Sequence, residues 1–295
     1  MKAVVLREVG GPLELEDVPE PEGDVLDVRA AGVNFADVLI RRGLYPQMPE
    51  LPYVLGSEVA GELNGRRVIA FVRGAGGYAE RVAVDPEWMF ELPARASFAG
   101  GAAFLTTFLT AHFALRSVEP GATVLVHAGS GGVGSAAIQL AKRAGATVVA
   151  TASTEEKRAF ARDQGADDVR GYDAVDDVRV DLVVDPVGGE TFDRSLPLLN
   201  PLGTIAAVGF TGGQWNDPSV QWLVGRNASV AGIYLGRLLR LAPQTVFAAA
   251  ENLLTLWENG EINPPVGATF PLAKAGAAHE LIESRRHVGK IVLEP

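Results

Sequence analysis

A glycine-rich loop is the part of the sequence that most directly predicts chemistry. Gly129-Ser-Gly131-Gly-Val-Gly134 has the spacing G-x-G-x-x-G, directly after an apolar run at 123–127 and directly before a stretch of helical composition at 135–144. Glycines allow the backbone to approach a diphosphate closely, and a helix N-terminus supplies unpaired N–H groups with a partial positive charge. The loop therefore predicts a dinucleotide-binding site, with Gly129 and Gly131 among the residues that contact the diphosphate.

The segment after the next predicted strand indicates which dinucleotide binds. That strand covers 147–151 and is followed by Ala152, where an NAD-specific site would place Asp or Glu to accept from the ribose 2′-hydroxyl. Ser153 and Lys157 follow instead, and a hydroxyl with a nearby ammonium suits a 2′-phosphate. NADPH is therefore the expected cofactor and NADH the alternative. Ser153 and Glu156 have the spacing of a capping box that starts the next helix.

Composition limits what other chemistry the chain can perform. None of its 295 residues is cysteine, which excludes disulfides, a thiol nucleophile, iron–sulfur clusters and thiolate-bound zinc. Lys and Arg number 26 against 36 Asp and Glu, and the resulting net charge of −10 disfavours nucleic acid and anionic membranes as partners. Residues 1–17 lack the apolar segment of a signal peptide, and no apolar run approaches the ~18 residues of a membrane span, so a cytoplasmic protein is expected.

The order of the predicted elements indicates two domains, one inserted into the other. Residues 1–98 contain short apolar strands separated by Gly and Pro clusters, which indicates a β-rich domain. Residues 99–261 alternate Val- and Ile-rich strands with Ala-rich helices, the pattern of a doubly wound parallel α/β sheet. Residues 262–295 return to the first pattern, with a helix at 273–286 and a final strand. The α/β domain is therefore expected to interrupt the β-rich one.

Motifs along nearly the whole chain, in order, resemble the zinc-free quinone oxidoreductases of the medium-chain dehydrogenase/reductase superfamily. They are Ala31-Gly-Val-Asn34-Phe-Ala-Asp37, Arg42-Gly-Leu-Tyr45-Pro46, the run from Leu51 to Gly61, the run from His127 to Lys142, Asp185-Pro-Val-Gly-Gly189 and Gly289-Lys-Ile-Val-Leu293. The resemblance implies a GroES-like β-rich catalytic domain with an inserted Rossmann domain. Zinc members of the superfamily hold their catalytic metal with Cys, His and Cys. The matching positions here carry Asn34, Ser57 and Thr106, which implies a metal-free reductase.

The resemblance also implies a role for each residue that matches a family motif. It places Gly131, Gly132 and Val133 at the diphosphate, Ser153, Lys157 and Tyr172 at the 2′-phosphate, Asn34 and Thr110 beside the nicotinamide, and Phe210 where the cofactor is covered. Without a metal, a hydroxyl, an amide or backbone N–H groups must stabilise or protonate the substrate oxyanion. Tyr45 is the expected proton donor, Asn34 the residue that orients the reacting groups, and Asp37 the residue that steadies Asn34.

The function implied is the NADPH-dependent transfer of hydride or electrons to a quinone. Reduction of an enone or an enoyl thioester is an alternative, because the chain between Gly61 and Arg67 is shorter than the family pattern and such loops shape the substrate cleft. An NADPH-binding protein with little turnover is another, since a fold does not guarantee an activity. A homodimer through the Rossmann domain is expected, because 229–235 has the pattern of an exposed edge strand.

Overall fold

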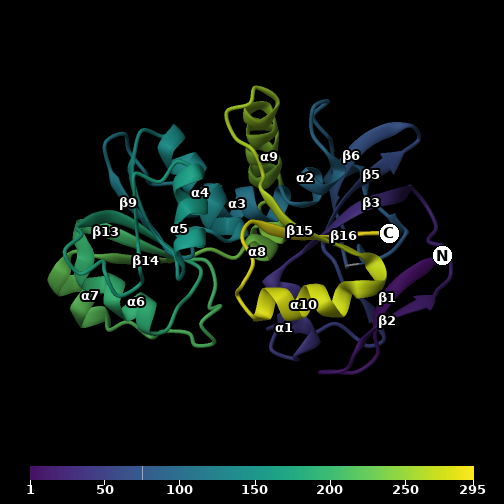
Figure 1. The fold of residues 1–295 in the computed structure, drawn as a ribbon, viewed down its shortest axis with the longest axis horizontal. Helices are drawn as coiled ribbons and strands as arrows, with labels where there is room; N and C mark the ends of the chain where they lie inside the picture. The colour runs from purple at the N-terminus through teal and green to yellow at the C-terminus, as the bar shows by residue number, and fades with distance from the viewer. Residues whose placement is uncertain (75) are drawn as a thin grey trace. The chain divides into compact units, whose positions relative to one another are not determined.

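The chain folds into two units, and the first of them is made from both of its ends. In the computed structural model, which describes residues 1–74 and 76–295, unit 1 contains Met1–Leu105 with Ala250–Pro295. Unit 2 contains Thr106–Ala249 (Figure 1). Each unit has its own buried apolar cluster: Leu55 and Tyr78 are fully buried in unit 1, and Leu125 and Ile205 in unit 2.

Unit 2 is built on a six-stranded parallel sheet with the strand order β11-β10-β9-β12-β13-β14. Its strands are β9 (Thr123–Val126), β10 (Thr147–Thr151), β11 (Asp168–Arg170), β12 (Val180–Asp185), β13 (Leu199–Ala207) and β14 (Ser229–Gly232). Numbered along the chain, this is the order 3-2-1-4-5-6 of the doubly wound Rossmann fold. The predicted fold class is therefore confirmed. The central strands are runs of buried Val, Leu and Ala, as a parallel sheet covered on both faces requires.

Helices follow most strands of this sheet, and further helices lead to unit 1. They are α3 (Leu105–Ala114), α4 (Gly132–Arg143), α5 (Glu155–Asp163), α6 (Glu190–Ser195), α7 (Val220–Arg226), α8 (Leu235–Leu241) and α9 (Pro243–Glu258). Residues 98–114 form two helices, α2 (Phe98–Ala102) and α3, with a break between them. Gly100 and Gly101 lie in α2, and glycine has a low helix propensity, so the short helix does not continue.

The described residues of unit 1 form two sheets. The smaller is antiparallel, in the order β2-β1-β4, and the larger has the order β15-β16-β3-β5-β6-β8, with β7 paired to β3. The strands are β1 (Lys2–Leu6), β2 (Leu13–Asp17), β3 (Val25–Val33), β4 (Tyr53–Val54), β5 (Glu58–Leu63), β6 (Arg66–Phe71), β7 (Arg81–Ala83), β8 (Met89–Glu91), β15 (Val266–Pro271) and β16 (Lys290–Glu294). Because β16 pairs with β3, the C-terminal segment completes the sheet that the N-terminal segment begins.

Two helices of unit 1 pack side by side and bear on the site described below. They are α1 (Phe35–Arg41) and α10 (Ala275–Glu283), which Figure 1 shows in purple-blue and yellow.

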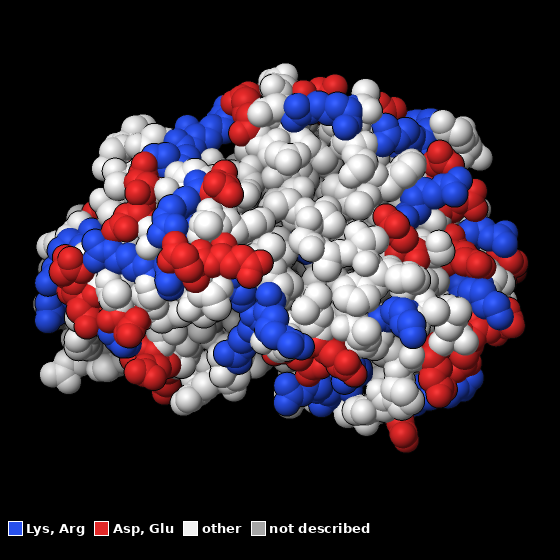
Figure 2. All heavy atoms as spheres, viewed as in Figure 1, with Lys and Arg blue, Asp and Glu red and all other residues white. Residues whose placement is uncertain are grey.

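Charged residues of both signs are interleaved over the face drawn in Figure 2, so that face does not present a broad field of one sign. Among the described residues, no helix has the length and apolar character needed to cross a membrane.

Candidate functional site

The glycine-rich loop connects the carboxyl end of β9 to the N-terminus of α4, as its spacing predicts. Gly131 is the N-cap of α4 and has no side chain to cap the first N–H groups of the helix. Gly129 donates its N–H to the carbonyl of Thr151 at 2.9 Å, which ties the loop to the end of β10. Uncapped N–H groups and the helix dipole make this end of α4 suitable for an anion.

The glycines of the loop are required for different reasons. A Cβ at Gly134 would lie 2.1 Å from the carbonyl oxygen of Ala128, and one at Gly129 would lie 2.9 Å from the Cβ of Ala150. Packing within the protein therefore requires glycine at both positions. A Cβ at Gly131 would meet only the carbonyl oxygen of Ala128, at 3.4 Å, and its φ of −83° suits any residue. The protein itself does not require glycine at position 131, whereas a closely approaching diphosphate would.

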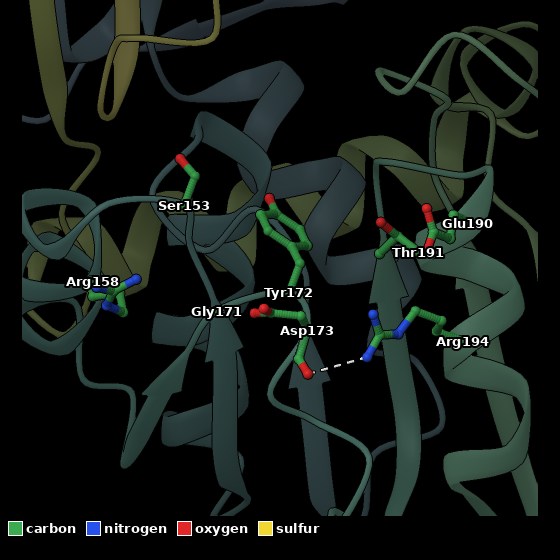
Figure 3. A pocket seen from close by; sticks show the side chains of 8 residues that line it. All are labelled: Ser153, Arg158, Gly171, Tyr172, Asp173, Glu190, Thr191 and Arg194. Carbon is green, nitrogen blue, oxygen red and sulfur yellow. Dashed lines mark hydrogen bonds between the residues drawn. The ribbon is translucent and has the colours of Figure 1, made fainter.

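A cavity of about 440 Å³ opens at the carboxyl ends of the neighbouring strands. It is lined by Ser153, Arg158, Gly171, Tyr172, Asp173, Glu190, Thr191 and Arg194. Ser153 follows β10, Tyr172 follows β11, and the last three residues lie on α6. Figure 3 shows Tyr172 near the centre, with Arg158 on one side and Arg194 on the other. Ligands of open α/β sheets bind at this edge of the sheet, so the cavity is placed for part of a nucleotide.

Ion pairs hold both cavity guanidinium groups in place. Nε of Arg158 donates to Glu155 at 2.9 Å, and Arg162, about one turn further along α5, donates to the same carboxylate at 2.8 Å. Nη2 of Arg194 donates to Asp176 at 3.0 Å and to the carbonyl of Asp173 at 3.2 Å. The remaining N–H groups of a guanidinium can then bind an anion in a fixed geometry.

The start of α5 differs by one residue from its prediction. The N-cap is Thr154, whose hydroxyl accepts from the N–H of Lys157 at 3.3 Å, so the predicted capping box of Ser153 and Glu156 is wrong. Ser153 is therefore left exposed at the cavity. Lys157 is largely buried in the first turn, and this burial lowers its pKa. Among the described residues that line the cavity, Arg158 and Arg194 are the cations, and the role of Lys157 at a 2′-phosphate stays a prediction.

A buried histidine supports Tyr172 from behind. The rings of His127 and Tyr172 are nearly parallel, with 16° between their planes and 6.0 Å between their centroids. The hydroxyl of Ser195 donates to the carbonyl of Thr191 at 2.7 Å, so it accepts from Nε2 of His127, also at 2.7 Å. Nδ1 of the ring then accepts from the hydroxyl of Thr151 at 2.9 Å. Burial lowers the pKa of His127 to about 3, so the ring is neutral and acts as a support.

In unit 1, Asn34 and Asp37 are brought together at the start of α1. The backbone N–H of Asn34 donates to Oδ2 of Asp37 at 2.8 Å, and the hydroxyl of Tyr78 donates to the same oxygen at 3.0 Å. Nε2 of His279, on α10, lies 3.3 Å from that hydroxyl. Asp37 is almost completely buried, which raises its pKa to about 6. A carboxylate so enclosed holds the backbone N–H of Asn34, and its role in a reaction stays a prediction.

The side chain of Asn34 belongs to a second buried cluster. Its Oδ1 accepts from Nζ of Lys290 at 2.5 Å, and its Nδ2 donates to Oε1 of Glu58 at 2.9 Å. Nζ of Lys290 also donates to that carboxylate oxygen, at 2.6 Å. The three groups therefore form a closed triangle around one ion pair.

The other predicted site residues lie in different parts of the chain. Tyr45 is half-buried in the bend that follows α1 in unit 1. Thr110 is buried on α3 in unit 2. Phe210 follows β13 and packs against the exposed ring of Trp215, with 4.3 Å between the centroids.

A zinc ion does not fit the residues at the positions where zinc members of the superfamily bind one. Zinc in proteins is held by Cys, His and carboxylate groups, whereas the matching positions carry the amide of Asn34 and the hydroxyls of Ser57 and Thr106. The amide oxygen already accepts from the Lys290 ammonium, which would repel a dication. Among the described residues, no three His, Cys, Asp or Glu side chains are grouped to hold a metal ion.

Arg158, Arg194 and Lys290 are not indicated as site residues by the sequence. Arg158 directly follows the predicted Lys157, so only the helical register could have distinguished them. Arg194 lies on α6 and Lys290 at the start of β16, far along the chain from the residues they join. The topology of the fold brings Arg194 and Lys290 to their sites, and no local sequence pattern indicates either residue.

Comparisons with known proteins agree with this architecture. Residues 21–94 match the family described as "Alcohol dehydrogenase GroES-like domain", and residues 159–293 match "Zinc-binding dehydrogenase". The chain is 33% identical to the quinone oxidoreductase of Lama guanicoe, over 99% of this chain and 97% of that protein.

Solved structures extend the likeness over the full length. The quinone oxidoreductase of Thermus thermophilus, determined alone and with NADPH, is 39% identical with a TM-score of 0.90, and the alignment covers 100% of both chains. The Escherichia coli quinone oxidoreductase complexed with NADPH is 30% identical with a TM-score of 0.91, again over 100% of both chains. Both solved proteins are named as oxidoreductases, and both share the fold of this chain over its full length. The chain therefore belongs to the quinone oxidoreductase family of the medium-chain dehydrogenase/reductase superfamily.

Proposed function

We propose that this protein is an NADPH-dependent reductase that transfers hydride or electrons to a quinone without a metal ion. The observation that carries the proposal is the cavity beside the glycine-rich loop, where Ser153 and Tyr172 meet the guanidinium groups of Arg158 and Arg194. These are the groups that bind a phosphate ester: hydroxyls and fixed cations around a concave wall. The solved relatives that contain NADPH support the same assignment.

The preference for NADPH over NADH rests on the end of β10. Ala152 is buried there, and Ser153 is exposed at the cavity. Neither residue has a carboxylate that could accept from a ribose 2′-hydroxyl. The nearest acid along the helix, Glu155, is bound to Arg158 and Arg162. Lys157 adds a positive charge in the same turn. A 2′-phosphate would therefore meet the hydroxyls of Ser153 and Tyr172 and two guanidinium groups, in a cavity that Asp173 and Glu190 also line.

The glycine-rich loop supplies the diphosphate site in this proposal. Gly129, Gly131, Gly132 and Val133 surround the N-terminus of α4, whose N–H groups would donate to the phosphate oxygens. The room left at Gly131 fits such an approach. The bound cofactor would supply hydride, while the protein contributes binding and orientation.

For the reduction itself we propose the role that the match to the family implies for each residue. Thr110 and Asn34 would contact the nicotinamide, and Phe210 would cover the cofactor. The hydroxyl of Tyr45 would donate a proton to the substrate oxygen, and Asp37, which is buried, would act through the backbone of Asn34.

We also propose that the protein forms a homodimer through unit 2. β14 is the last strand of the six-stranded sheet, and an edge strand can pair with its own copy across a two-fold axis. Val220 and Val224 on the preceding helix are 73% and 72% exposed, which adds apolar area near that edge. Light scattering after size-exclusion chromatography should give twice the chain mass, and a monomer at micromolar concentration would refute the dimer.

Cofactor titration tests the central assignment. NADPH should bind at least ~10-fold more tightly than NADH, because a charge-assisted hydrogen bond to a phosphate contributes roughly 1.5–3 kcal/mol and ~1.4 kcal/mol corresponds to a factor of ten. Nucleotide fluorescence at constant ionic strength would measure both dissociation constants. Equal constants would remove the role of the cavity as a 2′-phosphate site.

A further inference from the structure

Lys290 is a buried cation that the proposed reaction does not directly use. It begins β16 with 5% of its surface exposed, beside Glu58 at 1% and Asn34 at 8%. Its Nζ donates to Oε1 of Glu58 at 2.6 Å and to Oδ1 of Asn34 at 2.5 Å. Lysine is rarely buried to this extent without a partner, so the pair with Glu58 explains how the charge is tolerated.

The sheet of unit 1 brings these three residues together from distant parts of the chain. β3 lies between β16 and β5, with Val33 opposite Ile291 and Ala31 opposite Val59. Lys290 and Glu58 each lie one residue before those partners, on either side of the end of β3 that leads to Asn34.

Gly32 provides the room in which the Glu58 side chain lies. A Cβ at position 32 would be 2.6 Å from Oε1 of Glu58 and 2.2 Å from the carbonyl oxygen of Ala102. A residue with a side chain would therefore displace the carboxylate from its partners. The backbone is thus arranged to hold the acid at this point.

The hydrogen bonds fix the orientation of the Asn34 amide. An ammonium has only donors, so the amide atom bonded to Lys290 must be Oδ1. Nδ2 therefore faces Glu58 and donates to it at 2.9 Å. A rotation of the amide by 180° would set its N–H groups against the ammonium and its oxygen against the carboxylate. The ion pair permits one orientation, and in it Nδ2 has a second N–H beyond the one that Glu58 accepts.

We propose that Lys290 is a positioning residue: its ammonium, held by Glu58, orients the Asn34 amide so that the second N–H of Nδ2 faces the bound nicotinamide or the substrate oxygen. The inference rests on the proposed function, which places Asn34 at the nicotinamide. Buried ion pairs can often be replaced by apolar residues without loss of stability. The need to orient the Asn34 amide therefore explains the buried pair of Lys290 and Glu58 better than a contribution to stability does.

The test separates orientation from stability with a charge-neutral double variant. Lys290→Met alone leaves Glu58 buried without its cation and should lower the melting temperature. Adding Glu58→Gln removes the second charge and should restore most of that loss. If Lys290 positions Asn34, kcat should stay roughly 10–100-fold below that of the unsubstituted protein in the double variant, while the dissociation constant of NADPH changes less than about twofold. A double variant with full kcat would overturn the proposal.

Two controls make the result specific. Lys142→Met removes a lysine that binds Asp167 on the surface of unit 2, and its kcat should not change. Asn34→Ala should lower kcat, and adding Lys290→Met and Glu58→Gln to it should lower kcat no further. Additive losses would show that Lys290 acts on something other than Asn34.

One measurement does not depend on turnover. The side-chain amide resonances of Asn34, assigned by their loss in Asn34→Ala, should shift when NADPH is added to the unsubstituted protein and shift differently in the double variant. The same shift in both proteins would overturn the positioning role even if the enzyme is active. An inactive protein that still shows the expected difference would refute the proposed reaction and leave the positioning role supported.

Discussion

The rings of His127 and Tyr172 lie parallel to within 16°, which joins the strand before the glycine-rich loop to the wall of the proposed phosphate cavity. His127 is fixed by hydrogen bonds at both of its nitrogens, to Thr151 and Ser195. Tyr172 therefore rests on a support that does not rotate. Two neighbouring parts of the proposed nucleotide site, the loop and the cavity, are thereby held by one buried side chain.

The contribution of His127 to the stability of the protein should fall in acid. Burial lowers the pKa of His127 to about 3, below its ordinary value of 6.5, so between these values the unfolded chain binds a proton that the folded protein does not. The contribution of His127 is thus complete above pH 6.5 and is lost as the pH falls, by about 2 kcal/mol between pH 7.5 and pH 5. Urea unfolding of the unsubstituted protein and of His127→Gln at both pH values measures it. The stability difference between the two proteins should shrink at pH 5, and a constant difference would contradict the assignment.

Arg158 should determine the preference for NADPH, and Arg162 provides a matched control. Both guanidinium groups bind Glu155, but among the described residues Arg158 lines the cavity and Arg162 does not. Arg158→Ala should raise the NADPH dissociation constant ~10-fold, because a charge-assisted hydrogen bond is lost, and leave that of NADH within about twofold. Arg162→Ala should change neither. Equal effects of the two variants would mean that the loss comes from the Glu155 ion pair.

Two glycines of the loop should respond in opposite ways to substitution by alanine. Gly131→Ala meets no close neighbour in the protein, so the melting temperature should hardly change while NADPH and NADH both bind ~10-fold or more weakly. Gly134→Ala places a Cβ 2.1 Å from the carbonyl oxygen of Ala128 and should cost roughly 1–3 kcal/mol of stability. Thermal unfolding with cofactor titration distinguishes the two effects. Undiminished cofactor binding in Gly131→Ala would contradict the proposed diphosphate site.

Tyr45→Phe tests the proton donor. Removal of the hydroxyl should lower kcat ~100-fold, within the range of general acid catalysis, and leave the NADPH dissociation constant unchanged. Tyr53→Phe is the matched control in the same unit, since Tyr53 is a half-buried tyrosine whose pKa is raised by burial and by the charge of Asp37. The kcat of Tyr53→Phe should stay within about twofold of that of the unsubstituted protein. The reverse result would assign the proton donor to Tyr53.

The Rossmann sheet could be predicted closely because its signals are local. β10 spans Thr147–Thr151, the range that its apolar run predicts, and the glycine-rich loop enters α4 as its spacing requires. β13 begins at Leu199, which already pairs with Val180 of β12. That pairing depends on the assembled sheet, so a short apolar pattern in the sequence does not predict it.

The site was predicted less completely, for two physical reasons. Ser153 and Thr154 are both good N-caps, so the sequence does not decide which of them begins α5. The structure uses Thr154, and this shift of one residue alters which side chains face the cavity. The Lys290 cluster depends on contacts across 232 and 256 positions, which only the paired sheet brings about. Asn34 and Asp37 were found as neighbours because their spacing is local, whereas the cation that orients Asn34 was not.

The most direct test of the account is steady-state oxidation of NADPH with a quinone as acceptor. Enones and enoyl thioesters serve as alternative acceptors, with NADH measured in parallel. The account predicts rapid NADPH oxidation with a quinone, slower oxidation with the other acceptors, and a kcat/KM for NADH that is at least ~10-fold lower. Faster turnover of an enone or thioester would contradict the proposed substrate, and the absence of turnover with every acceptor would contradict the reductase itself.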